Sequence, residues 1–253
     1  IILKRVSKLF AMLIAAVGTM VFSACDTSTD GENFYVSYGE VVGTSESYTI
    51  KTDAGNTLHI VENLLPTFPV EDGMRVRVNF TIQEQSGSDL NVRLNAIEKV
   101  LSKEPVYSSQ LTPEELEELG NDPIYVKNAW FGGKYLNIDF AVLRFDPQLA
   151  HFINLYVDEE NSDENNVVVI LKHNAYEDPT TALAFGRVSF DISKLVPEGK
   201  SSIFVTLRWS NYDNMDCSDS GTFYLPTDGS SSGLNGIKDN PEGSSSAAYG
   251  AIK

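Results

Sequence analysis

Residues 75–82 read RVRVNFTI, a run in which polar and apolar side chains alternate without a break. Successive side chains of a β-strand point to opposite faces, so the run places its apolar side chains on one face and its polar ones on the other. An amphipathic helix would repeat its apolar residues every three or four positions instead. The stretch predicts a strand with one buried and one solvated face, and it indicates a β fold for the chain around it.

The segments around this strand alternate in the same way and are separated by turn residues. Further strands are expected over residues 34–42, 47–51, 57–61 and 90–96. About five such strands within roughly 80 residues are typical of a small closed barrel of the OB type. We therefore expect an OB-type β-barrel domain over residues 34–101.

A short helix is expected after the barrel. Thr112 can cap it, Pro113 suits the first helical position, and Glu115 completes a capping box with Thr112. The helix would cover residues 113–119 and lie in a linker over residues 102–123.

A second set of short alternating segments follows the linker. Strands are expected over residues 124–131, 134–143, 152–157, 167–172, 186–192, 202–209 and 221–225. About seven short strands joined by turns predict an antiparallel β-sandwich over residues 124–228, so the whole fold is expected to be all-β. Residues 229–253 are rich in Gly and Ser without a sustained apolar pattern, which indicates a flexible tail.

The first 24 residues predict a targeting signal instead of part of the fold. Three basic residues lie within the first eight positions, an apolar run extends from Leu9 to Phe22, and the small residues Ser23 and Ala24 precede Cys25. This order is typical of a secretory signal peptide, and the cysteine at the cleavage position indicates a bacterial lipoprotein. An ordinary secretory signal or a membrane anchor is the alternative, although the apolar run is short for a span of about 20 residues.

The lipoprotein interpretation assigns the N-terminal segments. Residues 1–24 would be the signal peptide, Cys25 would carry the lipid, and residues 25–33 would form a flexible tether. We therefore expect a protein held to the membrane through its N-terminal lipid, in the bacterial cell envelope, as an outer-membrane lipoprotein.

Charge and composition narrow the classes of function. Lys and Arg number 19 against 35 Asp and Glu, so the formal net charge is −16. An acidic surface repels the phosphates of nucleic acid, and we expect no nucleic-acid partner. Two cysteines and three histidines are too few for a disulfide scaffold, a Cys-based zinc module or a multi-His metal centre. We expect no cofactor.

Several short motifs follow one another in a recognisable order. The expected barrel contains DGMRVRV at 72–78, and the later segments read YLNI at 135–138, HFINL at 151–155, LKHNA at 171–175 and VSFD at 188–191. In this order, after a lipoprotein-type signal, the motifs resemble the NigD-like lipoproteins of Bacteroides-type bacteria. The resemblance covers most of the chain after the signal. It implies an N-terminal OB-type domain and a C-terminal β-sandwich, and it supplies no catalytic or binding residues.

The sequence contains no phosphate-binding loop, and its Gly-x-Ser-x-Gly pattern, GSSSG at 229–233, lies in the expected tail and outside any expected strand, where a nucleophile elbow would not form. The runs that begin at Asp26 and Asp216 resemble the start of a calcium loop, but Ser37 and Thr227 stand where that loop needs a bidentate Glu. Solvated acidic turns are therefore expected there. A carboxylate pair of the glycosidase type needs only spatial proximity, so a glycan or peptide hydrolase stays open as an alternative.

Two groups of residues are candidates for ligand binding. Arg75, Arg77 and Arg93 would share the outer face of the barrel, where OB folds often bind ligands, although ordinary ion pairs on a solvated face are the simpler interpretation. With a two-residue glycine turn, Trp130 would pair with Tyr135 on the outer face of the sandwich. Such an aromatic pair could stack on a sugar, or it could pack under a neighbouring domain.

The strands on either side of residues 158–166 make a further prediction. If they form a hairpin centred on Ser162, His151 lies directly opposite His173, on the face that carries the apolar row. Two adjacent imidazoles could share a metal or act as a pH switch. Histidines bonded to backbone carbonyls are the simpler interpretation, because a pair lacks a third metal ligand.

Together these features predict a lipid-anchored envelope protein that binds a protein or glycan partner and is not an enzyme. One alternative is an immunity-type protein that captures a bacteriocin or toxin. The other is the hydrolase with unidentified carboxylates.

Overall fold

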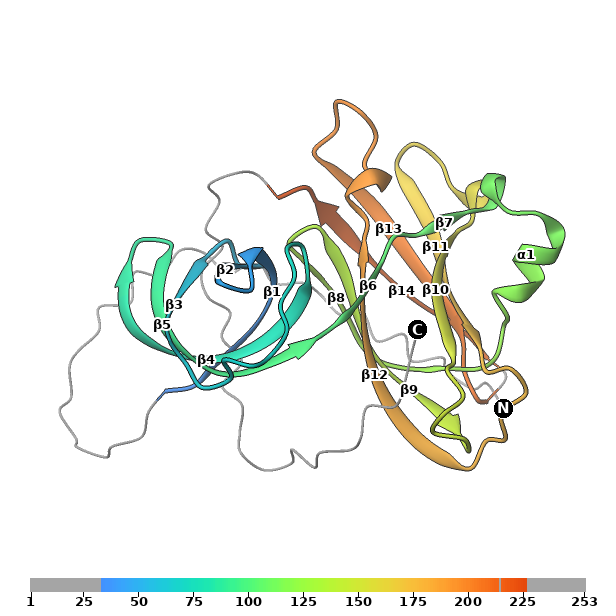
Figure 1. Ribbon diagram of the computed structural model, residues 1–253. Coiled ribbons are helices and arrows are strands. Elements are labelled where there is room, and N and C mark those ends of the chain that lie inside the picture. Colours follow the sequence, from blue (N-terminus) through green and yellow to red (C-terminus); the bar gives the residue numbers. More distant parts are fainter. Residues whose placement is uncertain (1–32, 214, 227–253) are drawn as a thin grey trace, which may run out of the picture. The chain divides into compact units, whose positions relative to one another are not determined.

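The computed structural model describes residues 33–213 and 215–226 (Figure 1). The expected signal peptide, the lipidation site Cys25, nearly all of the expected tether and the expected tail lie outside the described residues. Within the described part, no helix is long and apolar enough to cross a membrane. The fold is mostly β with one short α-helix among these residues, which confirms the predicted class.

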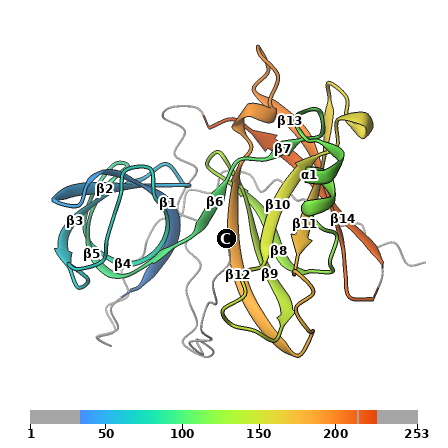
Figure 2. The ribbon, with the colours of Figure 1, turned by 45° about the vertical axis from the view of Figure 1, so that its right-hand side comes forward.

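The N-terminal part is a closed five-stranded barrel, as predicted (Figure 2). Its strands are β1 (Tyr35–Thr44), β2 (Ser47–Thr52), β3 (Thr57–Asn63), β4 (Arg75–Ser86) and β5 (Asp89–Lys99), joined in the order β1-β2-β3-β5-β4. The alternation that predicted β4 sets its faces, because Val76, Val78 and Phe80 are at most 1% exposed and lie in the barrel core. The opposite side chains of β4 therefore face outward.

The C-terminal part is a sandwich of two sheets (Figure 1). One sheet has the order β14-β13-β11-β10-β7, with β7 (Val106–Tyr107), β10 (Phe152–Val157), β11 (Asn166–Asn174), β13 (Ser202–Ser210) and β14 (Asp216–Tyr224). The other has the order β6-β12-β9-β8, with β6 (Leu101–Lys103), β8 (Tyr125–Gly132), β9 (Tyr135–Arg144) and β12 (Ala182–Asp191).

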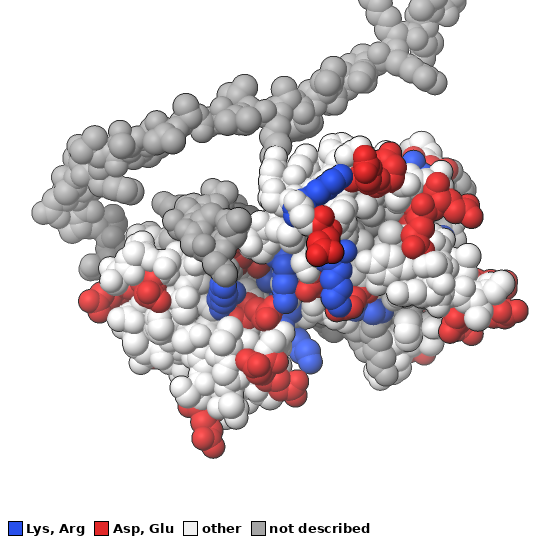
Figure 3. Space-filling view, turned by 90° about the horizontal axis from the view of Figure 1, so that it is seen from above, with Lys and Arg blue, Asp and Glu red and all other residues white. Residues whose placement is uncertain are grey.

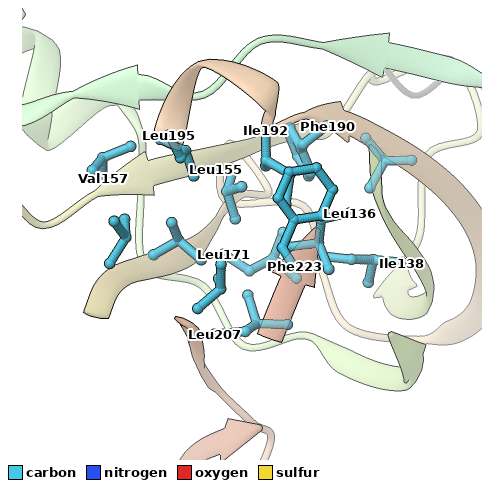
Figure 4. Packing of buried hydrophobic residues seen from close by; sticks show 14 of the residues in the cluster. Leu136, Ile138, Leu155, Val157, Leu171, Phe190, Ile192, Leu195, Leu207 and Phe223 are labelled. Atoms are coloured by element: carbon cyan, nitrogen blue, oxygen red, sulfur yellow. The ribbon is translucent and has the colours of Figure 1, made fainter. Parts of the chain in front are cut away.

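Apolar side chains from the two sheets meet in one core (Figure 4). Ile138 and Phe190 from one sheet and Leu155 from the other are fully buried. On β9 and β12 the core therefore takes alternate residues, and the residues between them form the outer face of the sheet β6-β12-β9-β8. That outer face positions the candidate site.

Short helices connect the strands. Helix α1 (Pro113–Glu118) starts as predicted, with the Thr112–Glu115 capping box formed. In the described part of the chain, three single turns of 3-10 helix accompany it, η1 (Ser108–Gln110), η2 (Glu159–Asn161) and η3 (Ser193–Leu195).

The structure corrects the expected linker over residues 102–123. Strands β6 and β7 begin at Leu101 and Val106, and they pair in parallel with β12 and β10 of the sandwich. Strands this short carry little alternation of their own, so pairing partners supplied by the rest of the chain decide their structure. The sandwich is also not wholly antiparallel, because β11 and β13 pair in parallel as well.

Two further predictions about strands are wrong. The run that begins at Asp216 is not an acidic turn but the first part of β14, which pairs antiparallel with β13 and starts opposite Ser210. The hairpin of β10 and β11 pairs Leu155 with Leu171 and Ile153 with His173, a register two residues away from the predicted one.

Candidate functional site

Arg75, the first residue of β4, is buried between the barrel and the sandwich. It is 2% exposed. Its Nη1 and Nη2 donate to the two carboxylate oxygens of Asp53, at 2.5 and 2.6 Å. Its Nη2 also donates to Oδ1 of Asn137 on β9 at 2.9 Å, and its Nε donates to Oγ of Ser189 on β12 at 3.1 Å. One guanidinium group therefore bonds a barrel loop and two strands of the sandwich.

Aromatic and charged side chains surround this guanidinium. Its central carbon lies 4.0 Å from the ring centroid of Tyr135, within the range of a cation–π contact. The Tyr135 hydroxyl donates to Glu40 at 2.6 Å, and Lys134 Nζ lies 3.1 Å from the same carboxylate and 3.4 Å from Asp191. Burial, together with Glu40, raises the pKa of the Tyr135 hydroxyl to about 12. Tyr135 therefore stays a neutral donor at physiological pH.

A second row of contacts extends the junction along β9 and β12. The Tyr38 hydroxyl of the barrel donates to Asp139 at 3.4 Å, and Arg187 Nη1 donates to Glu98 of the barrel at 3.1 Å. The Trp130 ring meets the Tyr38 ring edge-on, with centroids 5.3 Å apart.

Figure 3 shows Lys and Arg gathered in the middle of one face of the molecule, with acidic side chains beside them.

The three arginines predicted on a solvated barrel face have different environments. Arg77 and Arg93 do project outward with partly exposed side chains, and Arg77 Nη1 lies 3.9 Å from Glu98, while Arg93 donates to Asn95 at 3.0 Å. The prediction is wrong for Arg75, because the sandwich covers the end of β4 that carries it. Sequence alone did not reveal this cover, since the local pattern marks only which face of β4 points away from the barrel core.

The predicted pairing of Trp130 with Tyr135 is also wrong. Gly132 pairs with Tyr135, so the turn lies at Gly133-Lys134 and Trp130 faces Asn137. Both aromatic residues still lie on the outer face of the sheet, where Trp130 packs on the barrel and Tyr135 is 5% exposed. Of the two interpretations, packing under a neighbouring domain matches this placement.

The structure brings His151 and His173 together. They lie on the same face but diagonally, with His151 Nδ1 2.9 Å from His173 Nε2. Both are 1% exposed. On its far side, each ring has another partner, since His151 Nε2 lies 3.1 Å from Asp178 and His173 Nδ1 lies 3.0 Å from the carbonyl of Pro123. Asp178 belongs to a loop without strand periodicity, and no signal in the sequence pointed to it.

His151 and His173 are not part of a metal-ligand group in the described residues. Among residues 33–213 and 215–226, no group of three or more His, Cys, Asp or Glu side chains could hold a metal ion. The described part of the chain also contains one free cysteine, Cys217, on the edge strand β14.

Two carboxylates share a shallow cavity of about 230 Å³ at one end of the sandwich. Hydrogen bonds from Ser108 and Ser109 hold the pKa of Glu159 below its ordinary value. The amides of Asn165 and Asn166 do the same to the pKa of Asp163. A glycosidase acid needs a raised pKa, so this pair does not match that chemistry.

The outer face of the sheet β6-β12-β9-β8 continues beyond the contacts with the barrel as an apolar patch. Ala141 pairs with Tyr125 on one side and with Phe185 on the other, and the next row pairs Leu143 with Leu183. Tyr125 is 40% exposed and Leu183 is 49% exposed. We call Tyr125, Leu143, Leu183 and Phe185 the outer apolar patch.

Two contacts order the edge of this patch. The ring of Tyr212 lies against Tyr125, with centroids 4.6 Å apart, while its hydroxyl accepts a hydrogen bond from the amide of Leu143 at 2.7 Å. Lys127 Nζ lies 4.4 Å from the ring centroid of Phe185. The patch is therefore a fixed surface with an aromatic side and a cation beside it.

Two parts of the chain match the two domains of one protein family. The NigD-like N-terminal OB domain matches residues 38–100, and the NigD-like C-terminal beta sandwich domain matches residues 108–220. Comparison with curated proteins gives no match.

Solved structures are similar over most of the chain. A protein of Parabacteroides distasonis described as toxin-related is 25% identical with a TM-score of 0.65, and the match covers 76% of this chain and 94% of that one. A NigD-like immunity protein of Bacteroides caccae is 16% identical with a TM-score of 0.59, covering 79% of this chain and 100% of that one. A protein of Bacteroides fragilis described as a lipoprotein is 11% identical with a TM-score of 0.53, covering 77% and 98%.

At 16% and 11% identity, the Bacteroides caccae and Bacteroides fragilis proteins show a shared fold only. The family matches identify the family itself. They span the barrel and most of the sandwich, in the order that the sequence motifs implied. This chain belongs to the NigD-like family, with an N-terminal OB domain and a C-terminal β-sandwich domain.

Proposed function

We propose that this protein is a lipid-anchored protein of the bacterial cell envelope that binds a partner through the outer apolar patch, without catalysis. The observation that carries the proposal is the exposure of Tyr125 and Leu183 on a sheet face whose other half is covered by the barrel. Apolar side chains exposed in one cluster typically mark an interaction site. Tyrosine is also among the residues that contribute most to binding energy in protein interfaces.

The envelope location rests on the N-terminal segment and on one relative. Residues 1–24 have the order of a signal peptide and end before Cys25. The Bacteroides fragilis protein of the same fold is described as a lipoprotein. We propose the same anchor here, on the outer membrane.

A protein partner is favoured over a glycan partner, and an immunity-type role is the more specific candidate. One relative is described as an immunity protein and another as toxin-related. Capture of a toxin would use a preformed surface of this kind, since neither sheet needs to rearrange for Tyr125 and Leu183 to be contacted.

Crosslinking of the lipidated protein in its own envelope, followed by affinity capture, tests the binding surface. We expect the wild type to capture a partner, and we expect the double variant Tyr125→Ser and Leu183→Ser to lose it. Val61→Ser is the matched control, because Val61 is an apolar barrel residue that is 56% exposed. Capture that survives the double change, or that Val61→Ser abolishes equally, would contradict the proposed surface.

Digestion of the envelope extract before capture distinguishes the partner classes. Protease treatment should abolish capture if the partner is a protein, whereas glycosidase treatment should leave it unchanged. The reverse result would favour a glycan, and turnover of a glycan or peptide by the purified protein would overturn the assignment as a binding protein.

The anchor has its own test. Cys25→Ala should release the protein from the membrane fraction, because lipid transfer needs the thiol. A Cys25→Ala protein that sediments with membranes as fully as the wild type would show that another segment holds it there.

A further inference from the structure

One end of the sandwich core is closed by titratable and charged side chains instead of apolar ones. His151 precedes β10, His173 lies in β11, Asp178 follows β11, and Arg144 ends β9. None of the four is more than 6% exposed. Charges in such a place need fixed partners, because water is not available to solvate them.

The hydrogen bonds and the burial of His173 together determine where the protons of the two histidines lie. The carbonyl oxygen of Pro123 can only accept, so Nδ1 of His173, 3.0 Å away, carries a proton. Burial lowers the pKa of His173 to about 4, so the ring is neutral at pH 7 and its Nε2 has only a lone pair. Nδ1 of His151, 2.9 Å from that lone pair, must therefore donate.

Nε2 of His151 faces the carboxylate of Asp178, which also accepts hydrogen bonds from two backbone amides. Asp178 accepts hydrogen bonds from the amides of Phe145 at 2.8 Å and Asp146 at 3.1 Å. Burial raises the pKa of Asp178, but these amides and His151 outweigh it and hold the pKa below its ordinary value. An ionised carboxylate cannot donate, so Nε2 of His151, 3.1 Å away, also carries a proton.

We propose that His151 and Asp178 form a buried imidazolium–carboxylate pair, and that neutral His173 completes an acid-sensitive latch that opens when His173 gains a second proton. The new proton would sit on Nε2 of His173, where it would point at the N–H of His151. The hydrogen bond between the rings would become a contact between two donors and two positive charges.

The groups around the pair do not offset that extra charge. Asp122 faces His173 from the segment between α1 and β8 and favours a charged ring, but burial of His173 and the nearby His151 outweigh it. Arg144, at the end of β9, binds the carbonyl of Asp146, the residue whose amide Asp178 binds. Within the part of the chain that the structure describes, the Nε of Arg144 has no hydrogen-bond partner.

The latch holds two connecting segments. Arg144 donates to the carbonyls of Asp146 and Leu149 at 2.6 and 2.8 Å, and Asp178 binds the amides of Phe145 and Asp146, so residues 145–151 are tied from both sides. On the other side, His173 holds Pro123 through its ring and the amide of Asp122 through its carbonyl, at 2.9 Å.

Opening the latch would free both segments while leaving the barrel intact. The first of them carries Phe145, whose side chain is 66% exposed directly after β9. The proposal does not depend on the outer apolar patch, because its test reads protons and local opening and needs no partner.

Nitrogen NMR of the imidazole rings of the full chain tests the proton positions. The chain has three histidines, so His59→Gln and His173→Gln assign all the signals. At pH 7 we expect two protonated nitrogens on His151 and one, Nδ1, on His173. A neutral His151, or a His173 protonated at Nε2, would overturn the proposal.

Amide hydrogen exchange of the full chain between pH 7 and 4.5, corrected for its intrinsic pH dependence, tests the latch. Protection of residues 120–124 and 145–151 should fall by up to about tenfold for each pH unit below 6.5, since opening takes up one proton. Protection of β4 should not change. An equal change in all three segments, or no change in the first two, would contradict a local latch.

Two variants sharpen the result. His173→Gln offers His151 an acceptor that does not titrate, so protection of residues 145–151 should no longer depend on pH. His59→Gln changes an exposed histidine bonded to Asp89 and should behave like the wild type. Unchanged pH dependence in His173→Gln would overturn the latch, and if that variant fails to fold, the wild-type comparison with β4 decides the question.

Discussion

Arg75 exchanges nearly all of its hydration for protein partners. Its guanidinium meets a carboxylate with two parallel bonds, an amide oxygen, a hydroxyl and an aromatic face. Such an arrangement suits the planar, forked donors of arginine and does not suit the compact ammonium of lysine. Without Arg75, the charged carboxylate of Asp53 would lose its main partner.

We therefore predict that Arg75→Ala lowers the free energy of unfolding by about 3–5 kcal/mol, the cost typical of breaking a buried ion pair. Arg75→Lys should also destabilise, since one ammonium cannot form the two parallel bonds. Arg77→Ala is the control and should cost at most about 1 kcal/mol, because its ion pair with Glu98 is partly exposed. Urea unfolding measures all three, and equal losses for Arg75→Ala and Arg77→Ala would contradict the burial of Arg75.

His173 gives the free energy of unfolding of the sandwich a pH dependence of known sign. Burial lowers its pKa from 6.5 to about 4, so between these values the unfolded chain binds more protons than the folded one. The contribution of His173 to the free energy of unfolding is largest above pH 6.5 and falls as the pH drops. Below pH 4 it has decreased by roughly 3 kcal/mol.

Urea midpoints at pH 7 and pH 4.5 measure this effect. The wild type should lose roughly 2–3 kcal/mol more than His173→Gln over that interval. Carboxylates also titrate there, and the comparison between the two proteins cancels them. The same loss in both would show that His173 is not buried as a neutral ring.

At the scale of the elements, the hairpin of β8 and β9 is shaped by what lies against it. A Cβ atom on Gly132 would lie 2.5 Å from Oδ2 of Asp53 and 3.0 Å from Nδ2 of Asn137. Asp53 cannot move away, because Arg75 holds both of its oxygens. The glycine therefore allows the barrel loop to approach the hairpin.

Gly132→Ala should lower the free energy of unfolding by about 2–3 kcal/mol, as overpacking of a tight contact does. Gly221→Ala is the matched control, since it also lies in a strand of the sandwich and its Cβ would meet only a ring atom of Phe131, at 3.2 Å. We expect that change to stay within about 1 kcal/mol of the wild type. Thermal melting of both variants provides the measurement, and a tolerated Gly132→Ala would show that the loop of Asp53 can shift.

At the scale of the whole molecule, the two short strands β6 and β7 determine where the sandwich begins. Each covers an edge of a longer strand, β12 in one sheet and β10 in the other. A sandwich without them would expose the backbone groups of both edges, which promotes association between chains.

A fragment over residues 101–226 should therefore melt cooperatively with β-type circular dichroism, whereas one over residues 124–226 should melt at a lower temperature or aggregate. We also predict that the barrel folds on its own, because its buried residues form a separate core, so a fragment over residues 33–100 should melt cooperatively. Identical melting of the two sandwich fragments would mean that β6 and β7 contribute nothing to its edges.

The sequence by itself determined the local structure of this protein. Alternation over residues 75–82 and the similar runs predicted the strands, because the period of side chains along a strand is a property of the strand alone. The capping box at Thr112 predicted the start of α1 for the same reason, since its bonds lie within four residues. The order of the motifs identified the family, and with it the barrel and the sandwich.

Only the tertiary structure decided which outward face meets water and which meets another sheet. Arg75 and Arg77 have the same place in the pattern of β4, yet the sandwich covers only the first of them. The register of β10 and β11 was open for a related reason: a shift of two residues leaves every side chain on its own face, so the apolar pattern cannot distinguish the two pairings. The closeness of His151 and His173 is kept after that shift, but the direction of the hydrogen bond between them depends on Pro123 and Asp178, which folding brings to His173 and His151 from 50 and 27 residues away.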